Sequence, residues 1–215
     1  MAAINFKRKE IQLKIVYYGP GRGGKTTCLE YIKNRLHGQA YSDMIKLKSP
    51  ENRTLFFDFY PMRVGKVKGF DIRVQLYSVP GQNRLQPLRK LVLKGVDSIV
   101  FVADALSLRR KHNIDSFKNL IENLGYHNKE LFSMPFIIQL NKVDLAQENI
   151  PVISADTLMA DFSEGLEGAN LIEKVPVYET SAVSGANILK TLESIIMLTV
   201  KRLNFNAISK RSLSR

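Results

Sequence analysis

The sequence predicts an α/β domain in which helices cover both faces of a mostly parallel sheet. Residues 11–18, 98–103 and 135–140 are continuous apolar runs of strand length, typical of strands buried on both faces of a parallel sheet. Helical patterns alternate with these strands, and that order favours a doubly wound fold. At 215 residues and 45% hydrophobic content, the chain suits one domain with a full core.

The first half of the chain adds an antiparallel pair to the parallel strands. Residues 26–36 predict the helix that follows the first strand. Residues 37–50 mix Gly, Ser, Asp and Pro without a period and predict a long loop. Residues 55–60 and 70–76 predict two strands, and because a short link joins them, we expect them to be antiparallel. Apolar and polar residues alternate over 70–76, which predicts a strand with one wet face.

The second half completes a single domain. Residues 116–126 predict a helix, residues 175–179 a short last strand, and residues 188–203 a closing helix with one apolar face. We find no internal repeat and no linker rich in Pro or Ser, so residues 1–203 are expected to form one domain. Residues 204–215 contain three basic residues and no acidic one, which predicts a basic and flexible tail.

A glycine-rich segment between the first strand and the first helix predicts a phosphate-binding loop. The segment Gly19-Pro20-Gly21-Arg22-Gly23-Gly24-Lys25-Thr26 fits the pattern G-x-x-x-x-G-K-[ST] at every fixed position. Lys25 would reach the β- and γ-phosphates, and the Thr26 hydroxyl would bind Mg²⁺. The simpler alternative is a glycine-rich turn without a ligand. The residues expected to contact the nucleotide here are Gly19, Gly21, Arg22, Gly23, Gly24, Lys25, Thr26 and Thr27.

Two later loops predict selectivity for guanine. The sequence Asn141-Lys142-Val143-Asp144 follows a buried strand, and the Asp144 carboxylate can accept the two adjacent N–H donors of guanine, which adenine does not offer. Asn141 can bond the edge of the base and hold the loop, and the Lys142 stem can lie over the base. By itself this tetrapeptide could be a turn that begins a helix. Thr180-Ser181-Ala182 also follows a strand, and the Ala182 N–H can contact the guanine carbonyl.

Because all three loops follow strands of one predicted sheet, we expect them to converge at its carboxyl edge. Ser181 and Ala182 are therefore placed with Asn141, Lys142 and Asp144 as nucleotide-binding residues. The phosphate loop and the two guanine loops together predict GTP or GDP as the ligand, with Mg²⁺.

The formal net charge of +12 and the pI of about 9.8 invite an anionic membrane surface or an acidic partner. A solvated basic surface without a partner is the alternative. Nucleic acid is not expected, since no arginine-rich or aromatic-interleaved tract is present. No apolar run is long enough to cross a bilayer, no secretion signal is visible, and the single cysteine, Cys28, is expected to be a small packed residue. These features predict a cytoplasmic protein.

With these motifs in place, the sequence resembles the small Ras-like GTPases, and most closely the bacterial MglA-type proteins, which regulate gliding motility and cell polarity. The resemblance rests on residues 14–21, 52–59, 76–82 and 90–97, together with the guanine loops. It implies a Ras-like P-loop GTPase domain, with a mostly parallel central sheet, one antiparallel edge strand and helices on both faces. It also implies a GTP-hydrolysing switch that is slow without an activator and that is recruited to a cell pole.

The resemblance assigns roles to several residues. It implies that Thr54 binds Mg²⁺ in the GTP state, that Gln82 orients the attacking water, and that Arg53 is a built-in arginine finger. The simpler alternatives are that Arg53 is a solvated surface arginine and that Gln82 is a turn residue. Gly81, just before Gln82, is placed with the nucleotide-binding residues. The family's activator is a roadblock-fold dimer, MglB, and effectors are expected to bind the GTP-state switch segments.

Two positions depart from the family pattern. Ser78 stands where generic GTPases have an Asp that holds a Mg²⁺-bound water, whereas the MglA-type proteins usually carry a hydroxyl residue, Thr, so this departure is mild for the family. Because a charge is still missing near the metal, we hypothesise that Asp58 on the neighbouring strand partly replaces it. The alternative is that Asp58 points to solvent or pairs with Arg73. Arg22 adds a charge to the phosphate loop, where it would either tighten nucleotide binding or disturb the partner surface.

The sequence leaves two alternatives to the hydrolysing switch. A GTP-locked binding scaffold is weakly favoured by Ser78 and Arg22, but Arg53, Thr54 and Gln82 together argue against it. An RNA-linked GTPase is suggested only by the net charge of +12, and the chain has no room for an added RNA-binding domain.

Overall fold

The computed structural model describes residues 2–40, 45–48, 54–81, 86–164 and 172–203, with the backbone alone at 45–48 and 54–57. The strands are β1 (Ala3–Asn5), β2 (Glu10–Tyr18), β3 (Ile45–Lys48), β4 (Thr54–Val67), β5 (Phe70–Ser78), β6 (Ser98–Asp104), β7 (Phe136–Asn141) and β8 (Val177–Thr180). The helices are α1 (Lys25–Arg35), α2 (Gln86–Leu93), α3 (Arg110–Gly125), α4 (Ala155–Ser163) and α6 (Ile188–Lys201). Short 3₁₀ turns are η1 (His37–Gln39), η3 (Ser107–Arg109), η4 (Leu131–Ser133) and η5 (Val143–Glu148).

The strands form one mixed sheet in the order β3-β4-β5-β2-β6-β7-β8, with β1 paired to β2 beside this path. The pairs β2–β5, β2–β6, β6–β7 and β7–β8 are parallel, and the β4–β5 pair is antiparallel, as predicted. The fold class is therefore confirmed. Two short antiparallel pairings, β1–β2 and β3–β4, extend the sheet beyond the one antiparallel strand that was expected.

The prediction that residues 37–50 form only a loop is wrong, because β3 lies within that range. β3 pairs antiparallel with β4 through Ile45 opposite Phe59 and Lys46 opposite Asp58. Ile45 and Leu47 alternate with Lys46 and Lys48, which is a strand pattern too short to be recognised without the neighbouring strand. The boundary at 203/204 and the basic tail lie outside the described residues and stay predictions.

Burial along the strands follows the predicted patterns. Every residue of β6 and β7 is buried, as expected for strands covered on both faces. In β5, buried and half-buried residues alternate strictly, so one face of this strand is buried and the other is partly exposed to solvent. Within the described residues, no helix is long and apolar enough to span a bilayer.

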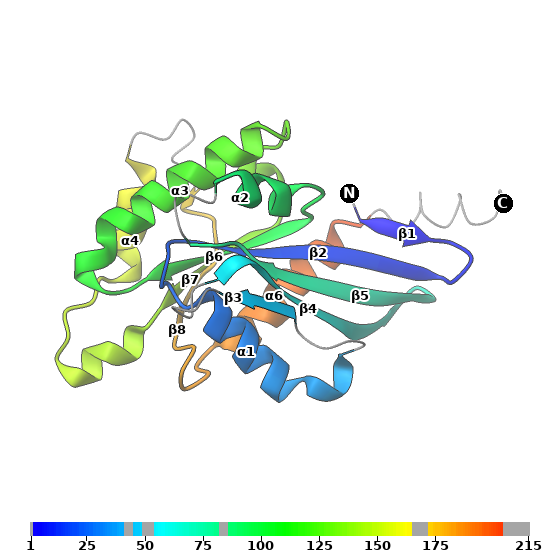
Figure 1. Ribbon diagram of the computed structural model, residues 1–215, viewed down its shortest axis with the longest axis horizontal. Coiled ribbons are helices and arrows are strands. Elements are labelled where there is room, and N and C mark those ends of the chain that lie inside the picture. Colours follow the sequence, from blue (N-terminus) through cyan, green and yellow to red (C-terminus); the bar gives the residue numbers. More distant parts are fainter. Residues whose placement is uncertain (1, 41–44, 49–53, 82–85, 165–171, 204–215) are drawn as a thin grey trace.

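Helices cover the two faces of the sheet and enclose two hydrophobic cores (Figure 1). α1 and α6 pack on one face through Leu29, Ile32, Leu192 and Ile195. The other face is covered by α2, α3 and α4, and its buried side chains include Leu93, Phe117, Leu120, Leu158 and Phe162. Cys28 on α1 is fully buried in the first core, which confirms that it is a packed residue.

Candidate nucleotide-binding site

The three predicted loops meet at the carboxyl edge of the parallel strands, and Asn141 joins them. At the end of β7, the Asn141 Nδ2 donates a hydrogen bond to the Gly23 carbonyl at 2.9 Å. Its Oδ1 accepts the Ala182 N–H at 2.9 Å and the Thr180 hydroxyl at 3.3 Å. The predicted convergence of the loops is therefore confirmed, and so is the role of Asn141 in holding them.

The phosphate loop has the close backbone approach that its glycines allow. Gly24 has φ +98°, and a Cβ there would lie 2.2 Å from Asn141 Nδ2. Gly19 has φ +145°, and a Cβ there would lie 2.2 Å from the Val102 carbonyl oxygen. Both positions therefore exclude any side chain, and the loop can pack its backbone against β6 and β7.

Lys25 is held inside this loop. Its Nζ donates to the Gly19 carbonyl at 3.0 Å and to the Pro20 carbonyl at 2.7 Å, and the residue is only 6% exposed. Burial, helped by the positive charge of Arg89, lowers the pKa of Lys25 to about 7. The ammonium group is therefore destabilised until an anion lies beside it.

The predicted metal-binding residue Thr26 contacts a buried carboxylate. The Thr26 hydroxyl donates to Asp58 Oδ2 at 2.5 Å, and the Ser78 hydroxyl donates to the same oxygen at 2.7 Å. Asp58 is fully buried, while Arg73 pairs with Glu10 at 2.6 Å. The alternative that Asp58 points to solvent or pairs with Arg73 is therefore wrong.

These oxygens suit a magnesium ion. Among the described residues, the other Asp58 oxygen, Oδ1, is buried without a hydrogen-bond partner, as a carboxylate oxygen that binds a cation or water would be. The Thr26 hydroxyl gives its proton to Asp58, and a hydroxyl that donates in this way presents lone pairs, which are the form in which it binds a cation. No cluster of three or more His, Cys, Asp or Glu side chains occurs within the described residues, so a metal here depends on hydroxyls and a single carboxylate.

The turn after β5 packs directly on the phosphate loop. A Cβ at Gly81 would lie 2.2 Å from the Gly21 Cα, so these two backbones touch. Arg22 is exposed and has a left-handed backbone with φ +65°, and Thr27 is also exposed. Of these predicted nucleotide contacts, Gly21 and Gly81 therefore lie at the junction of two loops, whereas the side chains of Arg22 and Thr27 lie on the surface.

On the base side, Lys142 has φ +75°, and its Nζ donates to Asp104 Oδ2 at 2.7 Å. This hydrogen bond holds Lys142 in place directly before η5. Asp144, in the first turn of η5, is half-buried. Ser181 is buried and caps its own loop, where its hydroxyl accepts the Ser184 N–H at 3.2 Å. The Ala182 N–H, predicted to contact guanine, donates to Asn141 in this structure.

Sequence reasoning missed several residues around the phosphate loop. Asp104, which ends β6, is fully buried and pairs with Lys142 and with Arg109. Arg109 also donates to the Gly21 carbonyl at 2.6 Å. Arg89 on α2 is 2% exposed and donates to the Pro80 and Gly81 carbonyls. No motif identifies these residues, although Asp104 follows a buried strand as the other site residues do.

The structure does not describe the side chains of the three predicted catalytic residues. Arg53 and Gln82 lie outside the described residues, and Thr54 begins β4 without a described side chain.

A phosphate loop joined through one asparagine to a guanine-selective loop defines a P-loop GTP-binding domain. The chain belongs to the ADP-ribosylation factor family of small GTPases, whose family model matches residues 2–199. It is 39% identical over 203 residues to the mutual gliding-motility protein MglA of Myxococcus xanthus, covering 94% of this chain and 98% of that protein.

More distant relatives are eukaryotic. The Ypt/Rab-type GTPase ypt7 of Schizosaccharomyces pombe is 25% identical over 94% of this chain and 89% of its own length. The Ras-related protein Rab7 of Drosophila melanogaster is 25% identical over 84% of this chain and 77% of its own length. The chain is thus an MglA-type small GTPase that binds guanine nucleotide and hydrolyses GTP.

Proposed function

We propose that this GTPase is a molecular switch that controls cell polarity or gliding motility, with GTP and GDP states read by partner proteins. The observation that supports it most is the junction at Asn141, which ties the phosphate loop at Gly23 to the base-recognition loop at Ala182. The similarity to a protein named for gliding motility supports the process it serves. A cytoplasmic location and recruitment to a cell pole follow from the same proposal.

In this switch, the backbone N–H groups of residues 21–26 and the positive end of α1 bind the phosphates. Lys25 contacts the β- and γ-phosphates, and the carboxylate of Asp144 accepts the two guanine donors. Thr26 and Thr54 hold Mg²⁺, and Asp58 orients the Thr26 hydroxyl and adds the charge that Ser78 lacks. When bound, Mg²⁺ neutralises charge on the phosphate oxygens.

For hydrolysis, Gln82 orients the attacking water, and Arg53 neutralises the charge that develops on the transferred phosphoryl group. Segments 40–60 and 78–94 would be ordered by GTP and released by hydrolysis. An activator of the roadblock fold, similar to MglB, would accelerate the reaction by repositioning these segments, and effectors would bind the same segments in the GTP state.

GTP hydrolysis by the purified protein tests this function, with and without a roadblock-fold protein from the same organism, in wild type and in Arg53→Ala. We expect slow turnover that the partner accelerates and that Arg53→Ala abolishes. Tight GTP binding without turnover in every mixture would instead support a GTP-locked scaffold.

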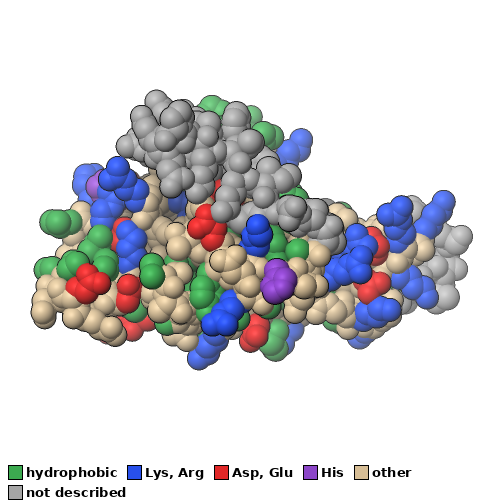
Figure 2. All heavy atoms as spheres, turned by 60° about the horizontal axis from the view of Figure 1, so that its bottom comes forward, with side chains coloured by type: hydrophobic (Ala, Val, Ile, Leu, Met, Phe, Trp, Pro, Cys, Tyr) green, Lys and Arg blue, Asp and Glu red, His purple; other side chains and the backbone are tan. Residues whose placement is uncertain are grey.

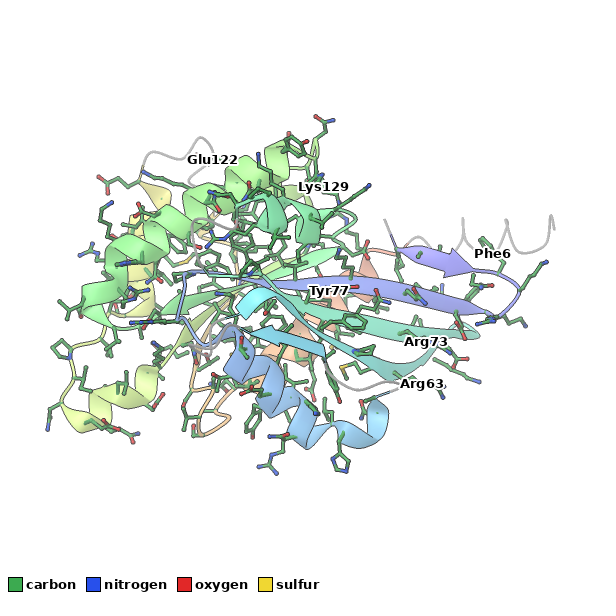
Figure 3. All side chains as sticks on the ribbon, viewed as in Figure 1. Phe6, Arg63, Arg73, Tyr77, Glu122 and Lys129 are labelled. Carbon is green, nitrogen blue, oxygen red and sulfur yellow. The ribbon has the colours of Figure 1, made fainter. Side chains whose placement is uncertain are left out.

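Part of the excess positive charge is concentrated at one end of the domain. Basic side chains gather at the end that lies opposite the nucleotide site (Figure 2). The Asp71 N–H donates to the Lys9 carbonyl at 2.7 Å, which brings the β1–β2 turn beside β5, and Lys66 and Lys201 line one apolar groove. Phe6, Arg63 and Arg73 lie at the same end (Figure 3). The exposed basic residues there are Lys7, Arg8, Lys9, Arg63, Lys66, Lys68, Lys201 and Arg202.

This end supports the proposal that the protein contacts an anionic membrane surface, which leaves the nucleotide edge accessible to partners. Vesicles with anionic lipid should bind the protein more tightly than neutral vesicles, and 0.5 M salt should release it, since screening at such salt is strong. Equal binding to both vesicles would count against a membrane and leave an acidic protein as the partner.

A further inference from the structure

The buried arginine Arg89 lies between the turn at 79–81 and helix α3. Arg89 Nε donates to the Pro80 carbonyl at 2.9 Å, and its Nη2 donates to the Gly81 carbonyl at 2.9 Å. A guanidinium is a rigid planar fork, so two such bonds fix the directions of both carbonyls. Arg89 therefore fixes the backbone conformation of Pro80 and Gly81.

The third branch of the same guanidinium reaches α3. Arg89 Nη1 donates to Asn119 Oδ1 at 2.8 Å. That oxygen also accepts the Tyr18 hydroxyl at 2.6 Å and the Asn123 Nδ2 at 3.1 Å. Tyr18 is the last residue of β2 and directly precedes Gly19. One buried network thus joins the turn at 79–81, helix α3 and the strand end that leads into the phosphate loop.

No carboxylate of the described residues pairs with this arginine. Within the described residues, its three acceptors are two carbonyls and one amide, all neutral. A buried charge is costly unless an opposite charge offsets it. Arg89 lines one cavity together with Pro20 and Gly21 of the phosphate loop. The phosphates of a bound nucleotide would supply the missing negative charge beside it.

The turn that Arg89 holds touches the phosphate loop itself. Gly81 and Gly21 are in backbone contact, so a shift of the turn changes its distance from the phosphate loop at once. Arg89 is anchored to α3 on its other side, where Asn119 is 8% exposed and Asn123 is 1% exposed. The position of Gly81 is therefore set by a packed helix and not by the turn alone.

We propose that Arg89 is a positioning residue for GTP hydrolysis: anchored by Asn119 and Tyr18, it holds the Gly81 backbone at the distance from the phosphate loop that hydrolysis requires. The inference rests on the proposed function, because it takes GTP hydrolysis as the reaction that the turn at 79–81 serves. It assigns to α3 a part in setting the rate, although no residue of α3 touches the reacting atoms in this scheme.

Arg89→Lys tests the proposal, because it keeps the positive charge and removes the fork. We expect the single-turnover rate of GTP hydrolysis to fall about 10- to 100-fold, since a misplacement of about 1 Å can cost that much. The dissociation constants of GDP and GTP should change less than about threefold, because the phosphate loop and Asp144 are untouched. Arg73→Lys, at the opposite end of the domain, is the matched control and should leave rate and affinity unchanged.

Tyr18→Phe removes one hydroxyl from the network without disturbing the fork, and it guards against a poorly folded arginine variant. We expect Tyr18→Phe to lower the rate less than Arg89→Lys does. In the double variant, the fold-loss of rate should be smaller than the product of the two single losses, because Tyr18 and Arg89 both donate to Asn119 Oδ1. The amide resonance of Gly81, measured by NMR in the GDP state, should shift in Arg89→Lys and not in Arg73→Lys.

Wild-type rates in Arg89→Lys, or an unshifted Gly81 resonance, would overturn the proposal. The proposal is also overturned if Arg89→Lys weakens nucleotide binding as many-fold as it lowers the rate and lowers the melting temperature as well. Such a result would show that Arg89 has a purely structural role. If wild type itself does not hydrolyse GTP, the proposed function fails, while the Gly81 resonance still reports whether Arg89 positions the turn.

Discussion

The Thr26 hydroxyl and the Asp58 carboxylate lie 2.5 Å apart, although 32 positions separate them in the chain. The contact brings the phosphate loop and β4 together in the interior, beside the hydroxyl of Ser78. A carboxylate is thus present at the site even though Ser78 replaces the acidic residue of other GTPases.

Asp58→Asn should weaken Mg²⁺ binding to the nucleotide complex. Loss of a residue that orients a metal ligand typically costs 10- to 100-fold in metal affinity, and we expect at least about tenfold here. Mg²⁺ titration of the complex with a fluorescent GDP measures it. Asp71→Asn, which removes an exposed carboxylate 3.9 Å from Lys66, is the control. Equal Mg²⁺ affinity in both variants would show that Asp58 has no part in the metal site.

Nucleotide binding should be accompanied by proton uptake. The pKa of Lys25 is lowered to about 7 by burial, so above pH 7 much of it is neutral in the free protein. Phosphates favour the ammonium form and raise this pKa, so the complex holds a proton that the free protein lacks. At pH 8 the uptake should approach one proton, and the affinity for GDP should fall as pH rises further.

Calorimetry of GDP binding in buffers of different ionisation enthalpy measures this uptake. At pH 6, where free Lys25 is already protonated, the Lys25 contribution should nearly vanish. Uptake that is the same at pH 6 and pH 8 would contradict the assignment.

Asp144→Asn should abolish the preference for guanine. An ionised carboxylate accepts the two N–H donors of guanine, whereas a carboxamide presents a donor that suits a base with a carbonyl at the same position. We expect the affinity for GDP to fall at least about 100-fold, because the site then leaves buried polar groups unpaired. Affinity for xanthosine diphosphate should rise in the same variant.

Competition binding of the two nucleotides checks this expectation. Asp115→Asn, at a surface ion pair with Lys111, is the control and should keep the preference for GDP. A variant at position 144 that still prefers GDP would remove Asp144 from the base site.

Gly81→Ala should slow hydrolysis without unfolding the protein. The added methyl group would lie 2.2 Å from the Gly21 Cα, so the turn has to move away from the phosphate loop. We expect the single-turnover rate to fall about 100-fold, since catalysis depends on small displacements at this junction. Gly125→Ala, where no atom lies within 4 Å of the added carbon, is the control. An unchanged rate at position 81 would show that the contact with Gly21 has no catalytic role.

The sequence was sufficient for the features that depend on local order. Buried strands, the phosphate loop and the guanine loops follow from apolar runs and fixed spacings, and parallel strands bring their carboxyl ends to one edge. The convergence of Gly23, Asn141 and Ala182 was therefore predictable.

Features that depend on distant partners were not predictable. β3 has four residues and exists through its pairing with β4. Arg89 belongs to a polar, basic stretch with no motif, and its role appears only when α2 lies against α3. The sequence alone does not determine which way the Asp58 side chain points. A change of one residue in strand register moves a side chain to the other face of the sheet, and the sequence does not fix that register.

The single cysteine provides an internal probe of opening at the phosphate-binding helix. Cys28 lies two residues after Thr26, is fully buried, and has a pKa raised to about 12 by that burial. Since the thiolate is the reactive form, a thiol reagent attacks Cys28 only when α1 separates from the sheet. The unaltered protein therefore reports, through its own alkylation rate, how often this helix detaches, and a cysteine engineered on the surface can be labelled without competition from it.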